Sequence, residues 1–237
     1  MKKVKNIAII PARIGSKRIK EKNIKKFFGK PIIYWTIEKL YESKIFDKIY
    51  VSTDSTKIIN ILKKFKFCEI ILRGPSLSND SIGTDQVIKH AMKKIDIQDK
   101  HLNICCVYPC NPFLNIPELK KAFSRLKKDK NSFVFPIVEY SHPIERAFEY
   151  ISKFTIKRIS KEEKKEKTQD YKKKYYDAGK YYLASKNTWS KTFRKKNGIV
   201  TKWWNGIDID EKGDWNKAEL IFQMMKLRSN KITKNKR

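Results

Sequence analysis

A short basic segment that follows an apolar run is the strongest chemical signal in the chain. Residues 7–11 predict a strand, and the segment PARIGSK (11–17) follows it directly. Open α/β sheets bind ligands at the carboxyl ends of their strands, so this loop is a candidate binding site. Arg13 and Lys17 can bracket a polyphosphate, and Gly15 allows a close approach of backbone to ligand. A basic turn in a lysine-rich protein is the alternative interpretation.

The loop matches neither of the two common phosphate-binding patterns. GxxxxGK[ST] is absent, because Gly15, Ser16 and Lys17 stand in the order Gly-Ser-Lys, and GxGxxG is absent as well. These absences argue against a kinase-like ATPase and against a dinucleotide-dependent dehydrogenase.

An acidic pair near the carboxyl end, Asp208 and Asp210, is the second chemical signal. It alternates with Ile207 and Ile209. On a strand, residues two apart point to the same face, so both carboxylates can meet one hard cation. Magnesium is often bound through one or two carboxylates together with substrate phosphates. A solvated strand end is the alternative, but the chain has only 25 Asp and Glu against 55 Lys and Arg, which favours a metal site.

The elements that must position these residues follow an alternating pattern. Strands are expected at 7–11, 48–53, 68–72, 103–108 and 132–138. Between them, apolar residues recur with helical spacing at 33–40, 58–65, 87–95 and 119–126. The pattern predicts an α/β fold with a mostly parallel sheet flanked by helices.

The pattern changes between residues 139 and 182. Alternating segments at 147–151 and 154–159 flank a charged stretch at 160–174, which is typical of a solvated loop or arm. Regular strands are expected again at 181–184 and 206–209, followed by a helix from Asp214. We therefore predict a single domain (1–237) with an inserted β-rich segment at 139–182 and a basic flexible tail at 229–237.

Composition limits the classes of protein that remain. The chain has 237 residues, a net charge of +30 and 40% hydrophobic residues, which excludes a largely disordered or fibrous protein. No apolar run approaches the ~20 residues that span a bilayer, so we expect a cytoplasmic protein with no membrane partner. The charge comes from 46 Lys and 9 Arg scattered along the chain, so no nucleic-acid partner is expected. The four cysteines form no CxxC pair and are expected to be free thiols.

Several segments carry a resemblance to a known family. IIPARIGSKRIKEKNI (9–24) resembles the signature of the sugar-acid cytidylyltransferases, which couple CTP to acidic sugars. Further similar segments are FFGKPIIYWTIE (27–38), FDKIYVSTDS (46–55), LRGPSLSNDSIGTDQVI (72–88), VYPCNPFL (107–114) and GIDIDEKGDWNKAELI (206–221). SHPIERAFEY (141–150) and YYDAGKYYLASKNTW (175–189) look most like the pseudaminic acid cytidylyltransferases. One departure is Ile14, which stands where the family usually has a second glycine.

The resemblance implies a Rossmann-like nucleotidyltransferase fold and a homodimer in which the inserted segment reaches the partner. The implied substrates are CTP and an acidic nine-carbon sugar, and the implied cofactor is Mg²⁺ on Asp208 and Asp210. Arg13 and Lys17 would hold the triphosphate during catalysis. Asp54 is expected mainly to cap a helix, with a minor role at the nucleotide.

The resemblance also implies two further sets of binding residues. Nucleotide-binding positions would be Ala12, Arg13, Gly15, Ser16, Lys17, Lys22, Asn23, Arg73 and Thr84. Sugar-binding positions would be Tyr108, Asn111, Arg146 and Asp177. Tyr108 as a core residue, Asn111 as a turn cap and Asp177 as a turn residue are open alternatives.

Three other functions remain open. A cytidylyltransferase for N-acylneuraminate, legionaminate or keto-deoxy-octulosonate would differ only in its sugar pocket. A glycosyltransferase would also use an Asp-x-Asp metal site, although it gives the basic loop no role. A basic nucleic-acid-binding protein would show affinity that falls steeply with salt.

Overall fold

The computed structural model describes residues 5–95, 99, 102–159 and 167–234, and the side chains of 229–234 are outside that description. The sheet strands are β1 (Asn6–Pro11), β4 (Lys48–Thr53), β5 (Cys68–Leu72), β6 (Asn103–Val107), β7 (Ser132–Glu139), β10 (Tyr175–Asp177), β11 (Tyr181–Ser185) and β12 (Lys195–Thr201). The α-helices are α1 (Ile32–Glu42), α2 (Thr56–Leu62), α3 (Thr84–Lys94), α4 (Ile116–Lys128), α5 (Lys186–Ser190) and α6 (Lys212–Lys234). Two short ribbons complete the structure, β2 (Lys26–Phe27) with β3 (Lys30–Pro31) and β8 (Phe148–Tyr150) with β9 (Ile156–Arg158).

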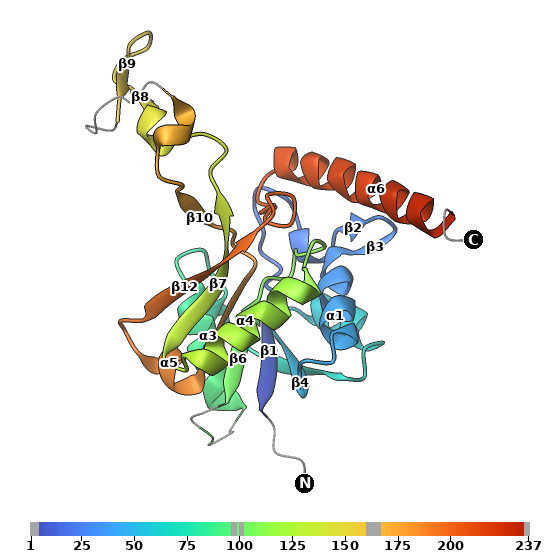
Figure 1. Ribbon diagram of the computed structural model, residues 1–237. Helices are drawn as coiled ribbons and strands as arrows, with labels where there is room; N and C mark the ends of the chain where they lie inside the picture. Colours follow the sequence, from blue (N-terminus) through green and yellow to red (C-terminus); the bar gives the residue numbers. More distant parts are fainter. Residues whose placement is uncertain (1–4, 96–98, 100–101, 160–166, 235–237) are drawn as a thin grey trace.

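The strands form one central sheet in the order β10-β7-β11-β6-β1-β4-β5, with β12 paired to β7 (Figure 1). The pairings β1–β4, β1–β6, β4–β5 and β12–β7 are parallel. β11 runs antiparallel between β6 and β7, because the chain returns from the inserted segment before it re-enters the sheet. The predicted α/β fold with a mostly parallel sheet is confirmed.

Helices cover both faces of this sheet, because successive side chains of β1 are buried against helices on opposite faces. Ala8 and Ile10 are fully buried in a cluster with residues of α1, α2 and α4. Ile7 and Ile9 point to the opposite face and pack with residues of α3 and α5. Both faces of a central parallel strand are therefore dry, which explains its continuous apolar sequence.

A third hydrophobic cluster lies outside the two faces of the sheet. Phe27, Trp215 and Phe222 pack edge to face, with ring centroids 5.2–5.5 Å from Phe27. Ile207 and Ile209 are buried in the same cluster. The strand predicted at 206–209 is wrong: the segment pairs with no strand among the described residues, and its two isoleucines pack instead in the cluster with α6 and Phe27.

Helix α6 is longer than predicted. It begins at Lys212, two residues before Asp214, and runs to Lys234. The backbone of residues 229–234 is thus helical where a flexible tail was predicted, and residues 235–237 are outside the described part of the chain.

The inserted segment projects from the body of the molecule (Figure 1). Its β8–β9 hairpin matches the alternating segments expected at 147–151 and 154–159. β10 then leads the chain back onto β7. Of the charged stretch predicted at 160–174, residues 160–166 are outside the description. None of the helices in the described part is long and apolar enough to cross a bilayer.

Candidate active site

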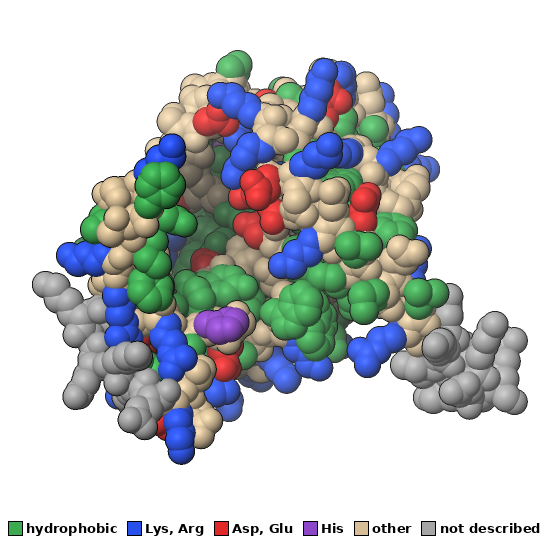
Figure 2. All heavy atoms as spheres, turned by 90° about the horizontal axis from the view of Figure 1, so that it is seen from above, with side chains coloured by type: hydrophobic (Ala, Val, Ile, Leu, Met, Phe, Trp, Pro, Cys, Tyr) green, Lys and Arg blue, Asp and Glu red, His purple; other side chains and the backbone are tan. Residues whose placement is uncertain are grey.

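A cleft of about 670 Å³ lies beside the basic loop, at the carboxyl end of β1. β1 pairs with β4 on one side and with β6 on the other, so the cleft opens where the chain connections diverge. Figure 2 looks down on this end of the sheet and shows a hollowed face with acidic and basic side chains around it. The cleft is lined by Pro11, Arg13, Ser16, Lys17, Arg18, Ile19, Lys22, Asn23, Asp80, Tyr108, Pro109, Cys110, Asp208 and Asp210.

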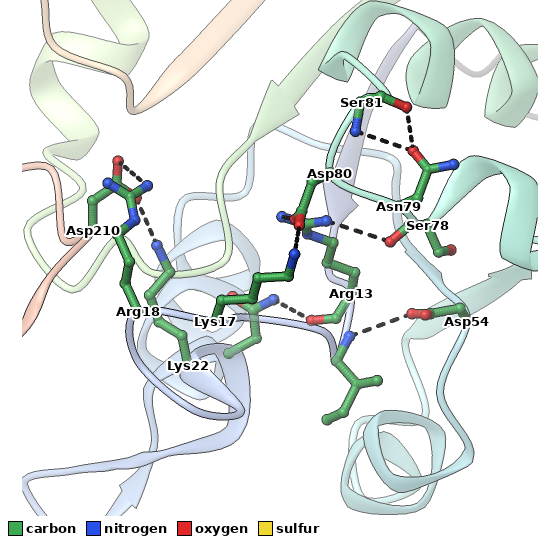
Figure 3. A network of polar contacts seen from close by, with 12 residues as sticks. Arg13, Lys17, Arg18, Lys22, Asp54, Ser78, Asn79, Asp80, Ser81 and Asp210 are labelled. Atoms are coloured by element: carbon green, nitrogen blue, oxygen red, sulfur yellow. Dashed lines mark hydrogen bonds and ion pairs between the residues drawn. The ribbon is translucent and has the colours of Figure 1, made fainter.

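Arg13 and Lys17 lie side by side on one wall of the cleft and share a counter-ion (Figure 3). Arg13 Nη2 lies 2.6 Å from Asp80 Oδ1, and Lys17 Nζ lies 2.6 Å from Asp80 Oδ2. Arg13 Nη1 also donates to the carbonyl of Ser78 at 3.4 Å. The two cations expected to bracket a polyphosphate are therefore close enough to hold one anionic group together.

Backbone contacts fix the basic loop (residues 12–17). Ala12 is fully buried and its amide donates to the Ser52 carbonyl at 2.8 Å. The Ser16 amide donates to the Ile14 carbonyl at 2.8 Å, which makes a tight turn. Asn23 is buried, and its Nδ2 donates to the Arg13 carbonyl at 2.7 Å. In this structure Asn23 thus supports the loop from behind.

Asp54 has a different role from the one expected. Ser55, not Asp54, caps α2 by accepting the amide of Ile58. Asp54 Oδ1 instead accepts the Ile14 amide at 3.4 Å (Figure 3). Ile14 packs its side chain against the core and has no left-handed backbone, so the missing family glycine creates no strain. A Cβ on Gly15 would meet nothing within 4 Å, and the expected close approach to a ligand stays a prediction.

The acidic segment (residues 207–210) forms another part of the cleft lining. Ile207 and Ile209 are buried in the third cluster, and this turns Asp208 and Asp210 toward the cleft. The same-face arrangement was inferred from a strand, and it arises here from an irregular segment whose isoleucines pack against α6. The segment still alternates buried isoleucines with aspartates that face the cleft, and this is the alternation that the sequence pattern indicated.

Two lysines hold the acidic segment by its backbone. Lys22 Nζ donates to the Ile209 carbonyl at 2.5 Å and to Asp210 Oδ1 at 2.9 Å. Lys180, only 3% exposed, donates to the Ile207 carbonyl from within the core. Arg18 Nη2 lies 3.4 Å from Asp210 Oδ2 (Figure 3). Lys22, expected among the nucleotide-binding residues, therefore contacts the acidic pair at Asp210.

Burial and these cations set the ionisation of the acidic pair. Burial in the concave wall raises the pKa of Asp208, and the charge of Lys180 opposes that shift. Partial burial acts in the same direction on Asp210, but the hydrogen bond and charge of Lys22 outweigh it and lower its pKa. Burial lowers the pKa of Lys180 to about 8, against the attraction of Asp208. Asp210 is therefore the more firmly anionic of the two carboxylates.

The acidic pair fits a hard divalent cation in its donor set. Two carboxylates face one cleft, and no cluster of three or more His, Cys, Asp or Glu side chains suited to a metal occurs in the described residues. Two protein carboxylates leave coordination positions for phosphate oxygens and water, as Mg²⁺ requires. Lys22 and Arg18 already offset the charge of Asp210, so the pair is a weak cation site by itself.

Arg73 and Thr84 are not among the residues that line the cleft. Arg73 is buried, its Nε donates to Ser78 Oγ at 3.1 Å, and its Nη1 has no hydrogen-bond partner within the described chain. An unpaired buried donor is costly, which fits a group that awaits a ligand oxygen. Thr84 Oγ1 lies 3.0 Å from the Tyr108 hydroxyl, and Tyr108 lines the cleft itself.

Three of the four expected sugar-binding residues lie around the start of β11, and Arg146 lies apart from them. The Tyr108 amide and Asn111 Nδ2 both donate to the Lys180 carbonyl, and the Tyr182 ring, whose hydroxyl donates to Asp177, lies 5.8 Å from the Tyr108 ring. Asn111 is fully buried, its Nδ2 donates to the Lys180 carbonyl at 3.4 Å, and its own carbonyl accepts the Leu114 amide. The carbonyl that accepts Leu114 is that of the backbone, and the side-chain Oδ1 of Asn111 has no hydrogen-bond partner within the described chain, so both interpretations of Asn111 stay open. Arg146 lies on the inserted segment over the Tyr171 ring, 5.6 Å from its centroid.

Asp177 lines a second cleft, of about 580 Å³, that meets the first at Asp208. Its Oδ1 accepts the Gly179 amide at 2.9 Å and its Oδ2 accepts the Tyr182 hydroxyl at 3.0 Å. Asp177 therefore both shapes the turn before β11 and faces a cavity beside the acidic pair.

Sequence reasoning missed three charged residues of the site: Arg18, Asp80 and Lys180. Asp80 lies in the turn (residues 80–84) that ends at Thr84, which the resemblance assigns to the cytosine pocket; it is 63 residues from Lys17, and no local pattern joins the two. Lys180 gave one usable signal, since a lysine between Gly179 and the apolar strand 181–184 is out of place unless it is paired inside the protein. Cys110 lines the cleft, but burial raises its pKa to about 12, so it remains a thiol and no nucleophile.

Comparison with known proteins identifies relatives along most of the chain. A family model described as Cytidylyltransferase matches residues 7–231. A pseudaminic acid cytidylyltransferase of Campylobacter jejuni subsp. jejuni serotype O:2 is 32% identical over 226 residues, covering 93% of this chain and 97% of that protein. A Helicobacter pylori protein named pseudaminic acid cytidylyltransferase and UDP-2,4-diacetamido-2,4,6-trideoxy-beta-L-altropyranose hydrolase is 35% identical over 178 residues, 75% of this chain and 34% of that protein.

Solved structures share the fold. A CMP:2-keto-3-deoxy-manno-octonic acid synthetase complexed with CTP superposes with a TM-score of 0.69 at 13% identity, covering 93% of this chain and 99% of that one. A 4-diphosphocytidyl-2C-methyl-D-erythritol synthase gives a TM-score of 0.66 at 13% identity, with the same coverage. At these identities the likeness concerns the fold alone.

Proposed function

This chain belongs to the cytidylyltransferase family, and we propose that it transfers CMP from CTP to the anomeric hydroxyl of a nine-carbon 2-keto sugar acid and releases pyrophosphate. Pseudaminic acid is the proposed sugar, because relatives that match nearly end to end bear that name. An N-acylneuraminate, legionaminate or keto-deoxy-octulosonate enzyme is the nearest alternative.

One observation carries the proposal: a single cleft presents paired cations and paired carboxylates. Arg13 and Lys17 come from the loop after β1, and Asp208 and Asp210 come from the segment before α6. A nucleoside triphosphate needs cations for its phosphates, and nucleotidyl transfer also needs a divalent ion at the reacting phosphate. The cleft contains side chains suited to both needs.

In the proposed reaction the protein acts mainly by positioning and by charge. Arg13 and Lys17 hold the β- and γ-phosphates and offset the charge that grows on the leaving pyrophosphate. The sugar hydroxyl attacks the α-phosphate in line, and binding both substrates in one cleft removes most of the entropic cost of their encounter. Arg73 and the turn that ends at Thr84 bind the cytosine, with the unpaired Nη1 of Arg73 as a donor to a base oxygen.

Asp208 and Asp210 are the residues proposed to hold Mg²⁺. The bound ion would withdraw electron density from the α-phosphate and favour the deprotonated hydroxyl. Lys22 and Lys180 keep the backbone of the acidic segment in place through the Ile209 and Ile207 carbonyls. Their charges also limit the repulsion between the two carboxylates before any cation arrives.

The second cleft is the proposed sugar site, because it meets the first at Asp208. Its lining includes Asp177, Glu139 and Lys217. The carboxylates can accept hydroxyl groups of the sugar, and the lysine can meet the sugar carboxylate. Tyr108 lines the first cleft and stays a proposed sugar contact.

We also propose that the inserted segment mediates a homodimer. It projects from the body and exposes apolar side chains, including Tyr150 at 79% and Phe154 at 87% exposure. Large exposed apolar groups on one projection are typical of a protein interface. Arg146 lies on the same inserted segment, and we propose that it contacts the sugar.

The test is pyrophosphate release by the purified chain with CTP, Mg²⁺ and one sugar acid at a time. Pseudaminic acid, N-acetylneuraminic acid and keto-deoxy-octulosonate are compared at equal concentration, and ATP, GTP and UTP serve as nucleotide controls. Release with pseudaminic acid and CTP alone is the expected result. Release with another sugar acid would retain the reaction and change the substrate, whereas the absence of CTP binding would overturn the proposal.

A further inference from the structure

Asp80 occupies the space between the two cations that the proposed function assigns to the triphosphate, and the inference below rests on that function. We propose that Asp80 is a specificity residue: its carboxylate competes with phosphate groups for Arg13 and Lys17, so that only a ligand with a polyphosphate displaces it.

The contact geometry makes Asp80 a bridging anion. Each carboxylate oxygen takes one cation, Arg13 on Oδ1 and Lys17 on Oδ2, both at 2.6 Å. The hydrogen bonds from Lys17 and Arg13 lower the pKa of Asp80, so the group is charged at neutral pH. A phosphate group that bridges the same two cations must take the place of this carboxylate.

Displacement is feasible because Asp80 is not built into the core. Its side chain is 47% exposed and lines the cleft. The turn that carries it is held by its own contacts: Asn79 Oδ1 accepts the amide and the hydroxyl of Ser81 (Figure 3). The carboxylate can therefore rotate away from Arg13 and Lys17 while the turn keeps its shape.

The free-energy cost of displacing the Asp80 carboxylate is also small, so the displacement is reversible. Ion pairs between half-exposed groups contribute little free energy, because water solvates both partners well. A triphosphate or pyrophosphate brings several charges and replaces both pairs. CMP has a single phosphate, at the reacting position, and gains nothing from these cations. Asp80 therefore disfavours small anions at the phosphate site and closes it again after pyrophosphate has left.

The turn also links this competition to the base pocket. Asp80 lies between Arg73 and Thr84 in the chain, and Ser78 contacts both arginines: its carbonyl accepts Arg13 and its hydroxyl accepts Arg73. A nucleotide that binds Arg73 with its base thus meets the same turn that its phosphates must displace.

The experiment compares the wild-type chain with Asp80→Asn by calorimetric titration of CTP, CMP and pyrophosphate. Asparagine keeps the size of the side chain and removes its charge. With exposed pairs of ordinary strength, CTP and pyrophosphate should bind roughly three- to tenfold more tightly to the variant, and CMP should change by less than about twofold. Glu69→Gln is the control, since it removes the same charge from an exposed pair with Lys48 outside the cleft.

A double-mutant cycle locates the effect. In a Lys17→Ala background one of the two cations is gone, so the gain from Asp80→Asn should shrink. An undiminished gain would show a general charge effect and overturn the proposal.

Other outcomes are equally decisive. Weaker or unchanged CTP and pyrophosphate binding by Asp80→Asn would mean that Asp80 organises the cations and does not compete for them. Equal tightening of CMP would contradict the selectivity. A chain that binds pyrophosphate but not CTP would overturn the proposed function, and the pyrophosphate comparison would then decide the role of Asp80 by itself.

Discussion

The ionic groups of the cleft already neutralise one another before any substrate is present. Asp80 pairs with Arg13 and Lys17, and Asp210 pairs with Lys22 and Arg18. Such pairing keeps long cationic side chains ordered at modest free-energy cost. It also means that nucleotide and metal must exchange partners within a preformed network.

A glycine at the acidic pair is required by this geometry. Gly179 has φ +60°, and a Cβ there would lie 3.0 Å from Asp208 Oδ2. Gly179→Ala should destabilise the fold by about 1–2 kcal/mol and lower kcat, because the added methyl group moves the Asp208 carboxylate. Metal-free CTP affinity should be unchanged. Urea unfolding, steady-state kinetics and CTP titration measure the three effects.

Gly83→Ala is the matched control for this prediction. Gly83 has φ −72°, and a Cβ there would meet nothing within 4 Å. Because Gly83 is the N-cap of α3 and Ala caps a helix less well than Gly, the variant should lose about 0.5–1 kcal/mol of stability, but kcat at saturating CTP should stay near the wild-type value. If Gly179→Ala were as active as Gly83→Ala, the placement of Asp208 beside Gly179 would not matter to the reaction.

At the scale of elements, α6 connects stability to the site. Its buried face packs on Phe27 and on the isoleucines that alternate with the two aspartates. The acidic segment pairs with no strand in the described part of the chain. It is held by this cluster, by Lys22 and Lys180, and by Asp214, which accepts the Asp210 amide at 3.0 Å. The packing of α6 therefore determines how well the carboxylates are placed.

Phe222→Ala tests that connection. Phe222 is 8% exposed and contacts the rings of Phe27, Trp35 and Phe113. Its truncation should cost about 3 kcal/mol of unfolding free energy and raise the Mg²⁺ concentration needed for half-maximal activity. Leu220→Ala, on the same helix but 64% exposed, should change neither. If Phe222→Ala lost stability but kept the wild-type Mg²⁺ dependence, the packing of α6 would not determine the placement of the carboxylates.

Sequence patterns predicted most of these elements. Strands β1, β4, β5, β6 and β7 and the four helices between them follow from apolar periodicity, because each element buries one or both faces. β12 was missed: KKNGIVT (195–201) has only two adjacent aliphatic residues and forms a strand by pairing with β7. The placement of β11 between β6 and β7 is a long-range pairing that no local signal records.

The site was predictable to a similar degree. The basic loop and the acidic pair follow from residue type and spacing, and both lie on the cleft. Asp80 and Lys180 could not be found in that way, since their partners are distant in sequence. Asp54 failed as a cap because Ser55, one residue later, has the extended backbone and hydroxyl that cap α2.

At the scale of the whole molecule, the projecting inserted segment exposes apolar side chains that nothing in the described part of a single chain covers. Phe148, Tyr150, Ile151, Phe154 and Ile156 on this segment are all more than half exposed. Apolar surface of this kind is stabilised when a second protein surface covers it.

The double variant Tyr150→Ser/Phe154→Ser should therefore be monomeric where the wild-type chain is a dimer. Light scattering after size-exclusion chromatography measures the mass of each. Phe193→Ser removes a 92% exposed ring outside the inserted segment and should leave the dimer intact. A wild-type chain that is monomeric at all concentrations, or a double variant that stays dimeric, would contradict this interface.

The central claim is that one cleft binds CTP with its cations and transfers CMP with the help of its acidic pair. The most direct test measures CMP-sugar formation by mass spectrometry for the wild type, Asp208→Asn and Asp210→Asn, together with CTP binding without metal. The wild type should form CMP-sugar and pyrophosphate in equal amounts. Each variant should lose at least about 100-fold in rate while it still binds CTP. Wild-type turnover in either variant would contradict the account.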